Sequence, residues 1–600
     1  MTIQFIHLNV KSEYTLLNSI AKSDDIIKKV QGFDIPAVAI TDMNTMHNAY
    51  HFEQHAKKAG VRNIIGATFC VKYEDTYGNL VLLAKDTKGY KNLVCLSTIA
   101  NKGEKKFAFI EFEKLQKYSE GLICLTGGTS GLPLKLFQEN DSWANVEVLL
   151  KELIDIYSVD NLYFEFQNHG TTIEKSYLSN QEIKNSLENL NLEVVATNDV
   201  YYLEPEHSFH RALALEMNPN PDGVPFYSSW VDSSDQWYLK TPEEMLDLFS
   251  PYLTSYPRIL SNTVAIADRC QASVPVEKAL PEFPIPEGFT EESYFRKLCE
   301  EGFHERFDGR DDIDLNVYRE RFEYEFDVIK KMGFMDYHTI TADFIQWAKD
   351  DKVYEHPERY FPKEYFPDYS KIPEKLWKKD YPILMGPGRG SAAGCLLCYC
   401  LKITDLDPIK DGLLFERFLN VERVSMPDID IDVPNQHRQS LIEYVQAKYG
   451  YEKVCQIATF QTLGVKSLIK SLGKAIGLTY NETDDMTKHV PDTEIVKVPN
   501  DEGIVVDTEV KVELLSQLEK YDFFKEKMQN PTVKHLFEVG KVLEGLPSAT
   551  GKHAAGVIIA RKDLMNYVPL MEVDGVLVSQ FEKKAVESIG LLKMDVRIVR

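Results

Sequence analysis

Three aspartates in one short segment have the spacing to bind a divalent cation. Segment 425–432 alternates isoleucine with Asp428, Asp430 and Asp432. Such alternation predicts a β-strand, on which residues i and i+2 share a face while the isoleucines point into a core. Carboxylates on one face repel one another unless a cation lies between them, and Mg²⁺ prefers carboxylate and water oxygens. An acidic, solvent-exposed strand face without a ligand is the alternative that this pattern leaves open.

A glycine-rich segment upstream could hold phosphates. In GPGRGSAAG (386–394) the glycines predict a flexible turn, and Ser391 is expected to cap a helix that begins at Ala392. Backbone N–H groups at a helix N-terminus, together with the Arg389 guanidinium, would form a site for a triphosphate. The segment lacks the GK[ST] ending of a Walker A loop.

Cys395, Cys398 and Cys400 follow directly, with the spacing C-x-x-C-x-C. A structural zinc site needs four ligands, usually from two such pairs, and the sequence shows no second pair. We therefore expect residues 395–402 to form a buried helix without a metal or redox role.

The bulk composition is that of a globular protein with several domains. A chain of 600 residues is too long for one core, so about three to five domains are expected. The formal charge of −24 argues against a uniformly basic surface, although a local basic track is enough to bind nucleic acid. The first residues lack the apolar core of a signal peptide, and no apolar run reaches the roughly 18 residues of a membrane span. Nine cysteines without regular spacing suggest a reducing compartment, so a cytoplasmic protein without a membrane segment is expected.

Residues 1–275 alternate apolar runs with amphipathic segments such as 23–31 and 49–60. Six runs predict buried parallel strands: 36–42, 63–69, 80–86, 122–128, 162–166 and 194–200. Repeated strand–helix units of this kind form a parallel-sheet α/β domain or a barrel. Polar residues follow the strands at the edge where such folds hold their active sites: Thr41, Asp42, Thr68, Asn198 and Asp199.

This part also resembles a known family. The segments FIHLNVKSEYTLL, ITDMNTM, GYKNLV, EFQNHG and ATNDVYYLEPE are similar to the PHP (polymerase and histidinol phosphatase) domain that opens bacterial replicative DNA polymerases. The resemblance implies a distorted barrel, which in active members holds several metal ions through His, Asp, Glu and Cys ligands. Four of the expected ligands are kept in this sequence: His7, Asp42, His169 and Asp199.

Most of the family's metal ligands are replaced. Histidine positions hold Asn9, Lys11, Met43, Asn79 and Tyr201, a glutamate position holds Thr68, and a cysteine position holds Gly128. Lys11 would place a cation where a metal ion should bind, and Met43 is a poor ligand for hard or borderline metals. We therefore expect the PHP-like part to be a scaffold with a degenerate metal site rather than a phosphoesterase or a proofreading exonuclease.

Residues 276–432 begin with a proline-rich linker and continue with helical patterns at 293–306 and 317–332. The segment 351–382 is rich in Tyr, Phe, Pro and Lys, and we expect a packed surface insertion rather than a base-stacking surface. The block GPGRGSAAG, followed by LLFERFLNVERVSMPDIDID, resembles the palm of the bacterial DNA polymerase III alpha family, the family C replicases.

The two resemblances together imply the fold class and the division of the chain. We expect a multidomain α/β protein: a PHP-type distorted (β/α) barrel, then a nucleotidyltransferase-type (polymerase beta-like) palm with an inserted α-helical thumb. The expected boundaries are 1–275 for the PHP domain, 276–432 for the first palm part, 433–548 for the thumb and 549–600 for the second palm part. Segments 546–560 and 578–595 fit the second palm part, with strands that complete the sheet beside the aspartate strand.

The resemblance also implies roles for individual residues. Asp430, Asp432 and Asp595 would be the catalytic carboxylates and would bind two Mg²⁺ ions, with Asp428 in a supporting role. The implied triphosphate-binding residues are Arg389, Gly390, Ser391, Lys552, His553 and Lys593.

Lys466, Lys470 and Lys474 are spaced to line one stripe of a helix, and Leu468 and Leu472 take another face. A lysine stripe is usually a solvated surface, but the match of this segment to the family's thumb implies contact with the DNA backbone. Residues 480–548 are acidic, and only helix is expected there.

These observations favour the front portion of a DNA-dependent DNA polymerase that acts on primer–template DNA and deoxynucleoside triphosphates. After Asp595 the family continues with a Phe-Leu-Gly-Leu run, and this chain has VRIVR. We expect it to need a separate C-terminal portion that carries the fingers, through which a sliding clamp and a proofreading subunit would be reached. The expected location is the cytoplasm of a bacterial or phage-infected cell. The alternatives are a non-catalytic replisome scaffold or DNA-binding subunit, and a PHP phosphoesterase or exonuclease.

Overall fold

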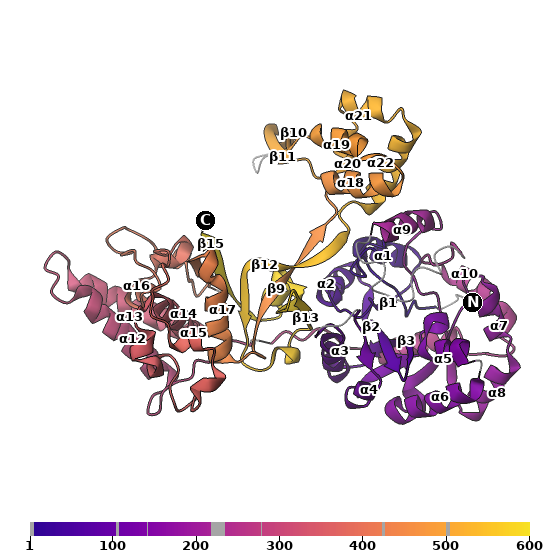
Figure 1. The fold of residues 1–600 in the computed structure, drawn as a ribbon, viewed down its shortest axis with the longest axis horizontal. Helices are drawn as coiled ribbons and strands as arrows, with labels where there is room; N and C mark the ends of the chain where they lie inside the picture. The colour runs from indigo at the N-terminus through magenta and orange to yellow at the C-terminus, as the bar shows by residue number, and fades with distance from the viewer. Residues whose placement is uncertain are drawn as a thin grey trace. The chain divides into compact units, whose positions relative to one another are not determined.

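A computed structural model describes residues 5–103, 107–140, 142–217, 234–277, 279–422, 427–499 and 505–599. The chain forms two compact units (Figure 1). The first unit comprises residues 1–274, 459–551 and 569–575, and the second comprises 275–458, 552–568 and 576–600. In the described part of the chain, no helix is long and apolar enough to cross a membrane.

The first unit contains a mixed sheet with the strand order β1-β2-β3-β5-β6-β7. Its strands are β1 (Ala37–Ile40), β2 (Arg62–Tyr73), β3 (Thr76–Ala84), β5 (Leu122–Leu125), β6 (Leu162–Gln167) and β7 (Glu193–Thr197), with β4 (Ile110–Glu111) beside β2. All six predicted strands are present, but the prediction that all are parallel is wrong at β3, which runs antiparallel to β2 and β5. Only Glu74 and Asp75 join β2 to β3, which permits a hairpin, whereas a parallel connection needs a crossover of a dozen or more residues.

The N-terminal segment closes this sheet. Val10 forms parallel bridges with Ile40 at the end of β1 and with Val200, which follows β7. The two edge strands are therefore joined through one short segment, so the expected barrel is confirmed. Helices surround it (Figure 1): α1 (Ser23–Gly32), α2 (Ala49–Ala59), α3 (Thr87–Ala100), α4 (Glu113–Lys117), α5 (Leu132–Asn140), α6 (Trp143–Tyr157), α7 (Thr172–Leu178), α8 (Gln181–Asn189), α9 (His207–Glu216), α10 (Pro242–Phe249) and α11 (Ser261–Arg269).

A helical subdomain belongs to the same unit. It contains α18 (Val465–Ala475), α19 (Tyr480–Lys488), α20 (Leu515–Leu518), α21 (Asp522–Lys527) and α22 (Pro531–Leu543). Leu468 and Leu472 of α18 share one apolar cluster with Leu17 and Tyr202 of the barrel. The expectation of helix alone is wrong for β10 (Thr493–Pro499) and β11 (Val505–Lys511), which form an antiparallel hairpin rich in β-branched residues. Another short strand, β13 (Leu570–Val573), completes the unit.

The second unit combines helices with a sheet in the order β14-β9-β12-β15-β8. The strands, with their full bounds, are β14 (Val576–Glu582), β9 (Val454–Thr462), β12 (Pro547–Ile559), β15 (Leu592–Val599) and β8 (Asp430–Pro434); β9 belongs to this unit up to Ala458 and β12 from Lys552. The helices are α12 (Glu291–Phe307), α13 (Leu315–Met332), α14 (Met335–Lys349), α15 (Glu374–Trp377), α16 (Leu396–Cys400), α17 (Asn435–Tyr449) and α23 (Lys583–Ser588). β15 pairs antiparallel with β12 and parallel with β8, as predicted for the strands that complete the sheet.

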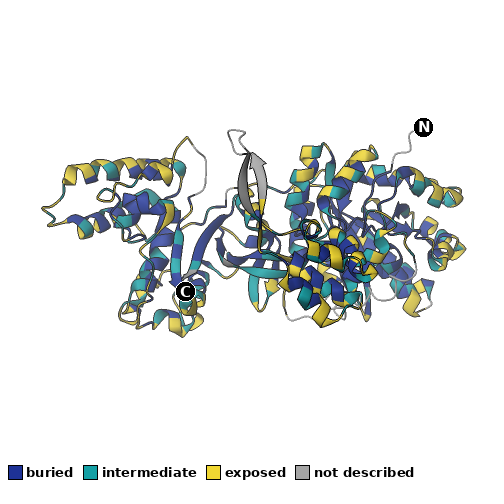
Figure 2. Ribbon diagram, turned by 90° about the horizontal axis from the view of Figure 1, so that it is seen from above, coloured by how far each residue is buried: buried dark blue, intermediate teal, exposed yellow. Residues whose placement is uncertain are grey.

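Burial follows the strands and the inner helix faces of each unit (Figure 2). The aromatic segment 351–382 is mostly irregular, with short 3₁₀ turns and the four-residue helix α15. Its residues Tyr360 and Phe361 are buried in the core of the second unit, beside Trp347 and Tyr444, which stack on each other. These contacts pack part of the segment, whereas Tyr354, Tyr365 and Tyr381 are exposed, so the packed insertion stays a prediction.

Candidate active site

The aspartates of the second unit are positioned by two neighbouring strands. β8 and β15 run parallel in a register that sets Asp430 opposite Asp595 and Asp432 opposite Arg597. Along β8 the half-buried aspartates alternate with buried Ile431 and Val433, as the sequence predicted. Asp428 lies just before the strand, and Ser425 and Met426 fall outside the described residues.

Three carboxylates converge at this edge. Asp428, Asp430 and Asp595 each offer an oxygen, and these oxygens lie within 4.8 Å of one another. Asp432 has a different neighbour, because its Oδ1 lies 2.8 Å from Nη2 of Arg389. Of the three predicted catalytic carboxylates, the structure therefore brings Asp430 and Asp595 together with Asp428 and pairs Asp432 with the predicted triphosphate-binding arginine.

Two further cations stand among these carboxylates. Nζ of buried Lys593 lies 2.6 Å from Oδ2 of Asp595 and 3.7 Å from Oδ1 of Asp428. Nε of Arg597 lies 2.9 Å from Oδ1 of Asp430. Burial raises the pKa of Asp430, and the charge of Arg597 acts in the opposite direction. Arg597 was not among the predicted site residues, although its position two residues after Asp595 places it on the same strand face.

One oxygen of Asp595 has neither an ion pair nor a hydrogen-bond donor among the described residues. Asp595 is 2% exposed, and its Oδ1 has no hydrogen-bond partner among the described residues. A buried carboxylate oxygen without a donor is costly, whereas hard divalent cations take such oxygens as ligands. The donor set of this site therefore fits a divalent cation.

The glycine-rich segment lies against the aspartate strand, but not as a helix start. Residues Gly390–Gly394 form a 3₁₀ turn, and the following helix α16 begins at Leu396 with Cys395 as its cap. The prediction that Ser391 caps a helix beginning at Ala392 is therefore wrong: Ser391 lies within the turn. A Cβ added at Gly386 would lie 2.7 Å from Cβ of Asp432, so only glycine allows this approach.

Two other predicted residues lie on β12, the strand beside β15. Gly556 of β12 is in register with Asp595, which places Lys552 and His553 within four residues of that position. Nδ1 of His553 accepts a hydrogen bond from the backbone N–H of Gly556 at 2.7 Å. Burial lowers the pKa of His553, so the neutral ring is favoured.

The three lysines Lys466, Lys470 and Lys474, here called the α18 lysines, lie in the first unit. All three are exposed, and the opposite face of α18 is buried through Leu468 and Leu472, as predicted. Lys466 pairs with a carboxylate at 2.7 Å and Lys470 with another at 3.5 Å. Their contact with DNA stays a prediction.

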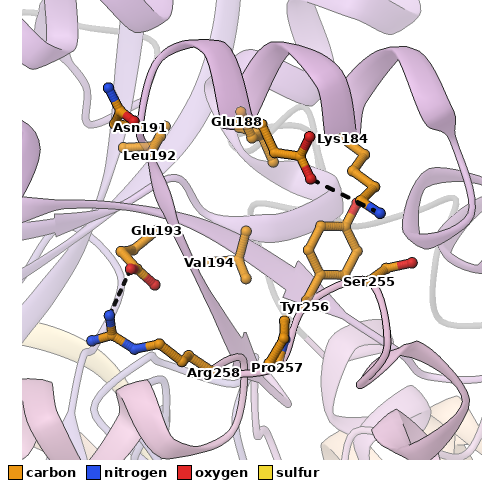
Figure 3. Close-up of a pocket in the computed structure, with 11 residues that line it drawn as sticks. Lys184, Glu188, Asn191, Leu192, Glu193, Val194, Ser255, Tyr256, Pro257 and Arg258 are labelled. Carbon is orange, nitrogen blue, oxygen red and sulfur yellow. Dashed lines mark hydrogen bonds and ion pairs between the residues drawn. The ribbon is translucent and has the colours of Figure 1, made fainter.

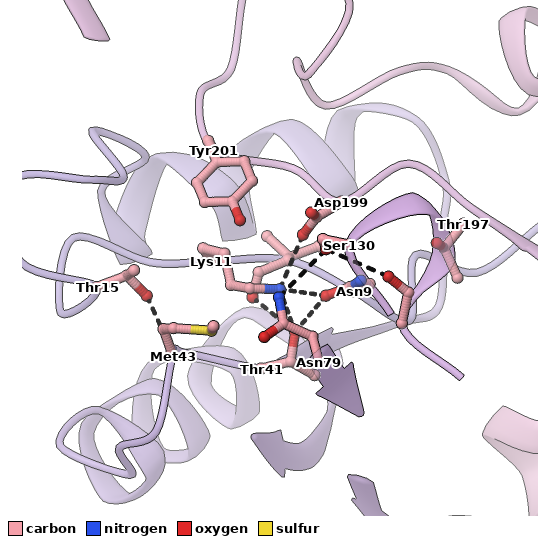
Figure 4. A network of polar contacts seen from close by, with 12 residues as sticks. Asn9, Lys11, Thr15, Thr41, Met43, Asn79, Ser130, Thr197, Asp199 and Tyr201 are labelled. Atoms are coloured by element: carbon pink, nitrogen blue, oxygen red, sulfur yellow. Dashed lines mark hydrogen bonds and ion pairs between the residues drawn. The ribbon is translucent and has the colours of Figure 1, made fainter. Parts of the chain in front are cut away.

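The barrel contains a second polar cluster, centred on Lys11 (Figure 4). Lys11 is 1% exposed, and its Nζ lies 2.9 Å from Oδ1 of Asp199 and 3.4 Å from Oγ1 of Thr41. Asn9 accepts a further hydrogen bond from the same ammonium group, and Asn9 in turn donates to Glu165 at 3.0 Å. The cluster thus carries its own cation.

The other three residues kept from the predicted metal-ligand set have internal partners. Nε2 of His7 lies 2.8 Å from a backbone carbonyl oxygen, and burial lowers the pKa of His7 to about 4. His169 lies 2.6 Å from Glu174, and Asp42 accepts hydrogen bonds from the backbone and hydroxyl of Ser12 at 2.7 Å. Within the ranges that the structure describes, none of these residues belongs to a group that could hold a metal ion.

A surface pocket of about 430 Å³ also lies on the first unit, between α8, β7 and residues 255–258 (Figure 3). Arg258 pairs with Glu193 at 2.8 Å along its wall, and Lys184 lies 3.9 Å from Glu188. None of the predicted site residues lines this pocket.

Comparison with known proteins adds an independent finding. Residues 293–359 and 363–597 match the model of the family described as "Bacterial DNA polymerase III alpha NTPase domain", and residues 7–169 match that of the PHP domain. The chain is 34% identical to the DNA polymerase III subunit alpha of Aquifex aeolicus and 33% identical to that of Bacillus subtilis, over 99% of its own length in both cases. It covers 51% and 48% of those two proteins, so it spans about half the length of the curated relatives that it matches.

Proposed function

The chain belongs to the bacterial DNA polymerase III alpha family, and from that membership we propose that it carries the catalytic carboxylates of a DNA-directed DNA polymerase. The reaction is the template-directed transfer of a nucleotidyl group from a deoxynucleoside triphosphate to a primer 3′-hydroxyl. One observation carries the proposal: Asp428, Asp430 and Asp595 converge at one strand edge, and Asp595 keeps a buried oxygen without a partner.

The residues that would hold two Mg²⁺ ions are Asp430, Asp432 and Asp595, with Asp428 beside Asp430 and Asp595, and with Asp432 two positions after Asp430 on the same face of β8. Bound Mg²⁺ would activate the primer 3′-hydroxyl and neutralise the charge on the leaving pyrophosphate. Lys593 holds one oxygen of Asp595 at 2.6 Å, and this contact turns the other oxygen toward the ligand position. Lys593 is thus a positioning residue for the third carboxylate.

We assign triphosphate binding to Arg389, to Gly390 and Ser391 in the turn that follows it, and to Lys552 and His553 on β12. Arg389 forms an ion pair with Asp432 in the structure. When it binds the nucleotide, it exchanges that ion pair for one with a phosphate. The same exchange frees Asp432 to act as a metal ligand, which reconciles its pairing with the catalytic role.

Primer–template DNA is the proposed macromolecular substrate, and the α18 lysines neutralise its phosphates without selecting sequence. The chain spans about half the length of its relatives, and we propose that the part of the relatives outside this span corresponds to the fingers and to the links to a sliding clamp and a proofreading subunit. The curated relatives are bacterial proteins, so the proposed location is the cytoplasm of a bacterial or phage-infected cell.

Primer extension on a primed single-stranded template tests the proposal, with Mg²⁺ and four nucleotides, and with and without the remaining portion of a relative in trans. Asp430→Asn and Asp595→Asn should abolish extension, because each removes a charged ligand. Asp411→Asn, an exposed aspartate of the same unit, should leave it unchanged. Extension that survives both site variants, or DNA binding without extension in every arm, would favour the scaffold alternative.

A further inference from the structure

A second cluster of side chains that could bind a metal ion lies in the second unit, on α14 and at the start of α16 rather than on β8 and β15. Donor atoms of His338, Cys395 and Cys398 lie within 4.8 Å of one another, and all three residues are 0% exposed. His338 is on α14, whereas the cysteines are at the start of α16. No metal was predicted here, because the sequence shows one cysteine pair and does not place the distant histidine beside it.

The histidine is oriented as a metal ligand is. Nδ1 of His338 lies 2.7 Å from the carbonyl oxygen of Phe334, so it carries the proton and donates it. This fixes the tautomer with a lone pair on Nε2, and Nε2 has no hydrogen-bond partner among the described residues. Metal-bound histidines characteristically donate their other ring N–H to a backbone carbonyl or carboxylate.

A carboxylate lies beside this group of three donors. Oε2 of Glu325, on α13, accepts a hydrogen bond from Sγ of Cys395 at 3.3 Å, and Glu325 is 0% exposed. Sulfur and oxygen ligands on one tetrahedral zinc ion stand about 3.5 Å apart, given the usual bond lengths. Cys395 also accepts a hydrogen bond from the backbone N–H of Cys398 at 3.3 Å, a bond that a thiolate accepts more strongly than a thiol.

We propose that this cluster is a structural site for one Zn²⁺ ion, with His338, Cys395 and Cys398 as the ligands already in place and Glu325, beside Cys395, as the fourth ligand that the bound ion would draw in. Two thiolates and one carboxylate bring three negative charges, which the zinc ion and the Arg321 guanidinium, 2.6 Å from Glu325, neutralise. The buried site is therefore neutral as a whole, which is the condition for burying so many charged groups. Thiolate and imidazole ligands in this number favour zinc over magnesium or calcium.

The ion would tie α13, α14 and α16 together behind the carboxylates. Tyr337, next to His338, accepts a hydrogen bond at 3.2 Å from the backbone N–H of Ile429, the residue between Asp428 and Asp430. Loss of the ion should therefore loosen the support of the aspartate segment. The inference does not depend on the proposed polymerase activity, because its primary readout is metal content.

The test measures zinc in the full chain, expressed with zinc and purified without chelator, by elemental mass spectrometry. One equivalent per chain is expected, and Co²⁺ substitution should give the thiolate charge-transfer bands and the tetrahedral d–d absorption. Cys398→Ser and His338→Asn should lose the ion, whereas Cys400→Ser, a buried cysteine on the same helix, should keep it.

Wild-type protein that holds well below one equivalent of zinc and gives no cobalt bands would overturn the proposal, whether or not the variants fold. The cluster would then be a hydrogen-bonded thiol–imidazole group. Zinc retained in full by Cys398→Ser would overturn it equally, because the ion would be bound elsewhere.

Discussion

Arg597 stands where a cation would bind, so its removal should strengthen metal binding at the carboxylates. Its Nε lies 2.9 Å from Oδ1 of Asp430, and its Nη2 lies 3.8 Å from Oδ2 of Asp595. The four aspartates of the site face three cations, namely Lys593, Arg389 and Arg597. In Arg597→Leu the same four carboxylates face two cations, and one competitor of the metal ion is gone.

The size of the effect follows from the exposure of the pair. Two unit charges about 4 Å apart interact by about 4 kcal/mol at an effective dielectric constant of about 20. The Arg597 side chain is 41% exposed and that of Asp430 is 17% exposed, and exposed pairs are worth only about 1 kcal/mol or less. An intermediate value of about 1.4 kcal/mol corresponds to a tenfold change in affinity. Arg597→Leu should therefore bind Mn²⁺ or Mg²⁺ about tenfold more tightly.

Titration with Mn²⁺, followed by electron paramagnetic resonance of the free ion, measures this affinity directly. Arg597→Lys keeps the positive charge and should stay near the wild-type value. Arg561→Leu removes an arginine of the same unit that pairs with Glu282, and it should change nothing at the carboxylates. The reasoning is refuted if Arg597→Leu binds Mn²⁺ no more tightly than wild type, or if Arg597→Lys binds it as tightly as the leucine variant.

Further predictions concern the first unit. Lys11→Met should destabilise it by about 3–5 kcal/mol, because the Asp199 carboxylate loses its buried partner, and the added exchange Asp199→Asn should restore part of that loss in denaturant unfolding. Because the pKa of His7 is about 4 when folded and 6.5 when unfolded, the unfolded state binds more protons between these pH values. The free energy of unfolding should therefore fall by about 3 kcal/mol as the pH drops from 6.5 to 4. In His7→Gln the free energy of unfolding, taken from unfolding curves between pH 4 and 6.5, should depend less on pH. Replacing the α18 lysines by glutamine should weaken DNA binding alike for all sequences and reduce the slope of log affinity against log salt concentration; an unchanged slope would leave these lysines as a solvated face.

The sequence carries enough information to predict the elements around the site. The alternation of aspartate and isoleucine fixes the face of β8, and the apolar runs 556–560 and 590–595 give β12 and β15. Such patterns depend on the periodicity of apolar residues over a few neighbouring positions, which can be read directly from the sequence. Errors arose where the outcome depended on geometry instead, as in the direction of β3, which its two-residue connection decides, and in the 3₁₀ turn in place of a helix at Gly390–Gly394.

The partners of the side chains could not be predicted, because they depend on residues far apart in the chain. Arg597 reaches Asp430 only through the parallel register of β8 and β15, and His338 reaches Cys398 only through the packing of α14 on α16. A sequence lists the residue types that could form an ion pair or a metal site. It does not say which atoms face one another, and that decides whether a carboxylate is already neutralised.

That distinction separates the two candidate chemistries of this chain. In the barrel, the ammonium group of Lys11 is already hydrogen-bonded at the centre of the polar cluster, so a metal ion would have to displace a covalently attached, buried cation. On β15, Asp595 presents a buried oxygen that no described residue partners, and its cationic neighbours hold only the other oxygen. The Lys11 ammonium group would therefore repel a divalent ion in the barrel, whereas the free oxygen of Asp595 offers such an ion a ligand. This difference favours a metal ion at the carboxylates of β8 and β15 over a metal ion in the barrel, on grounds independent of the family resemblance.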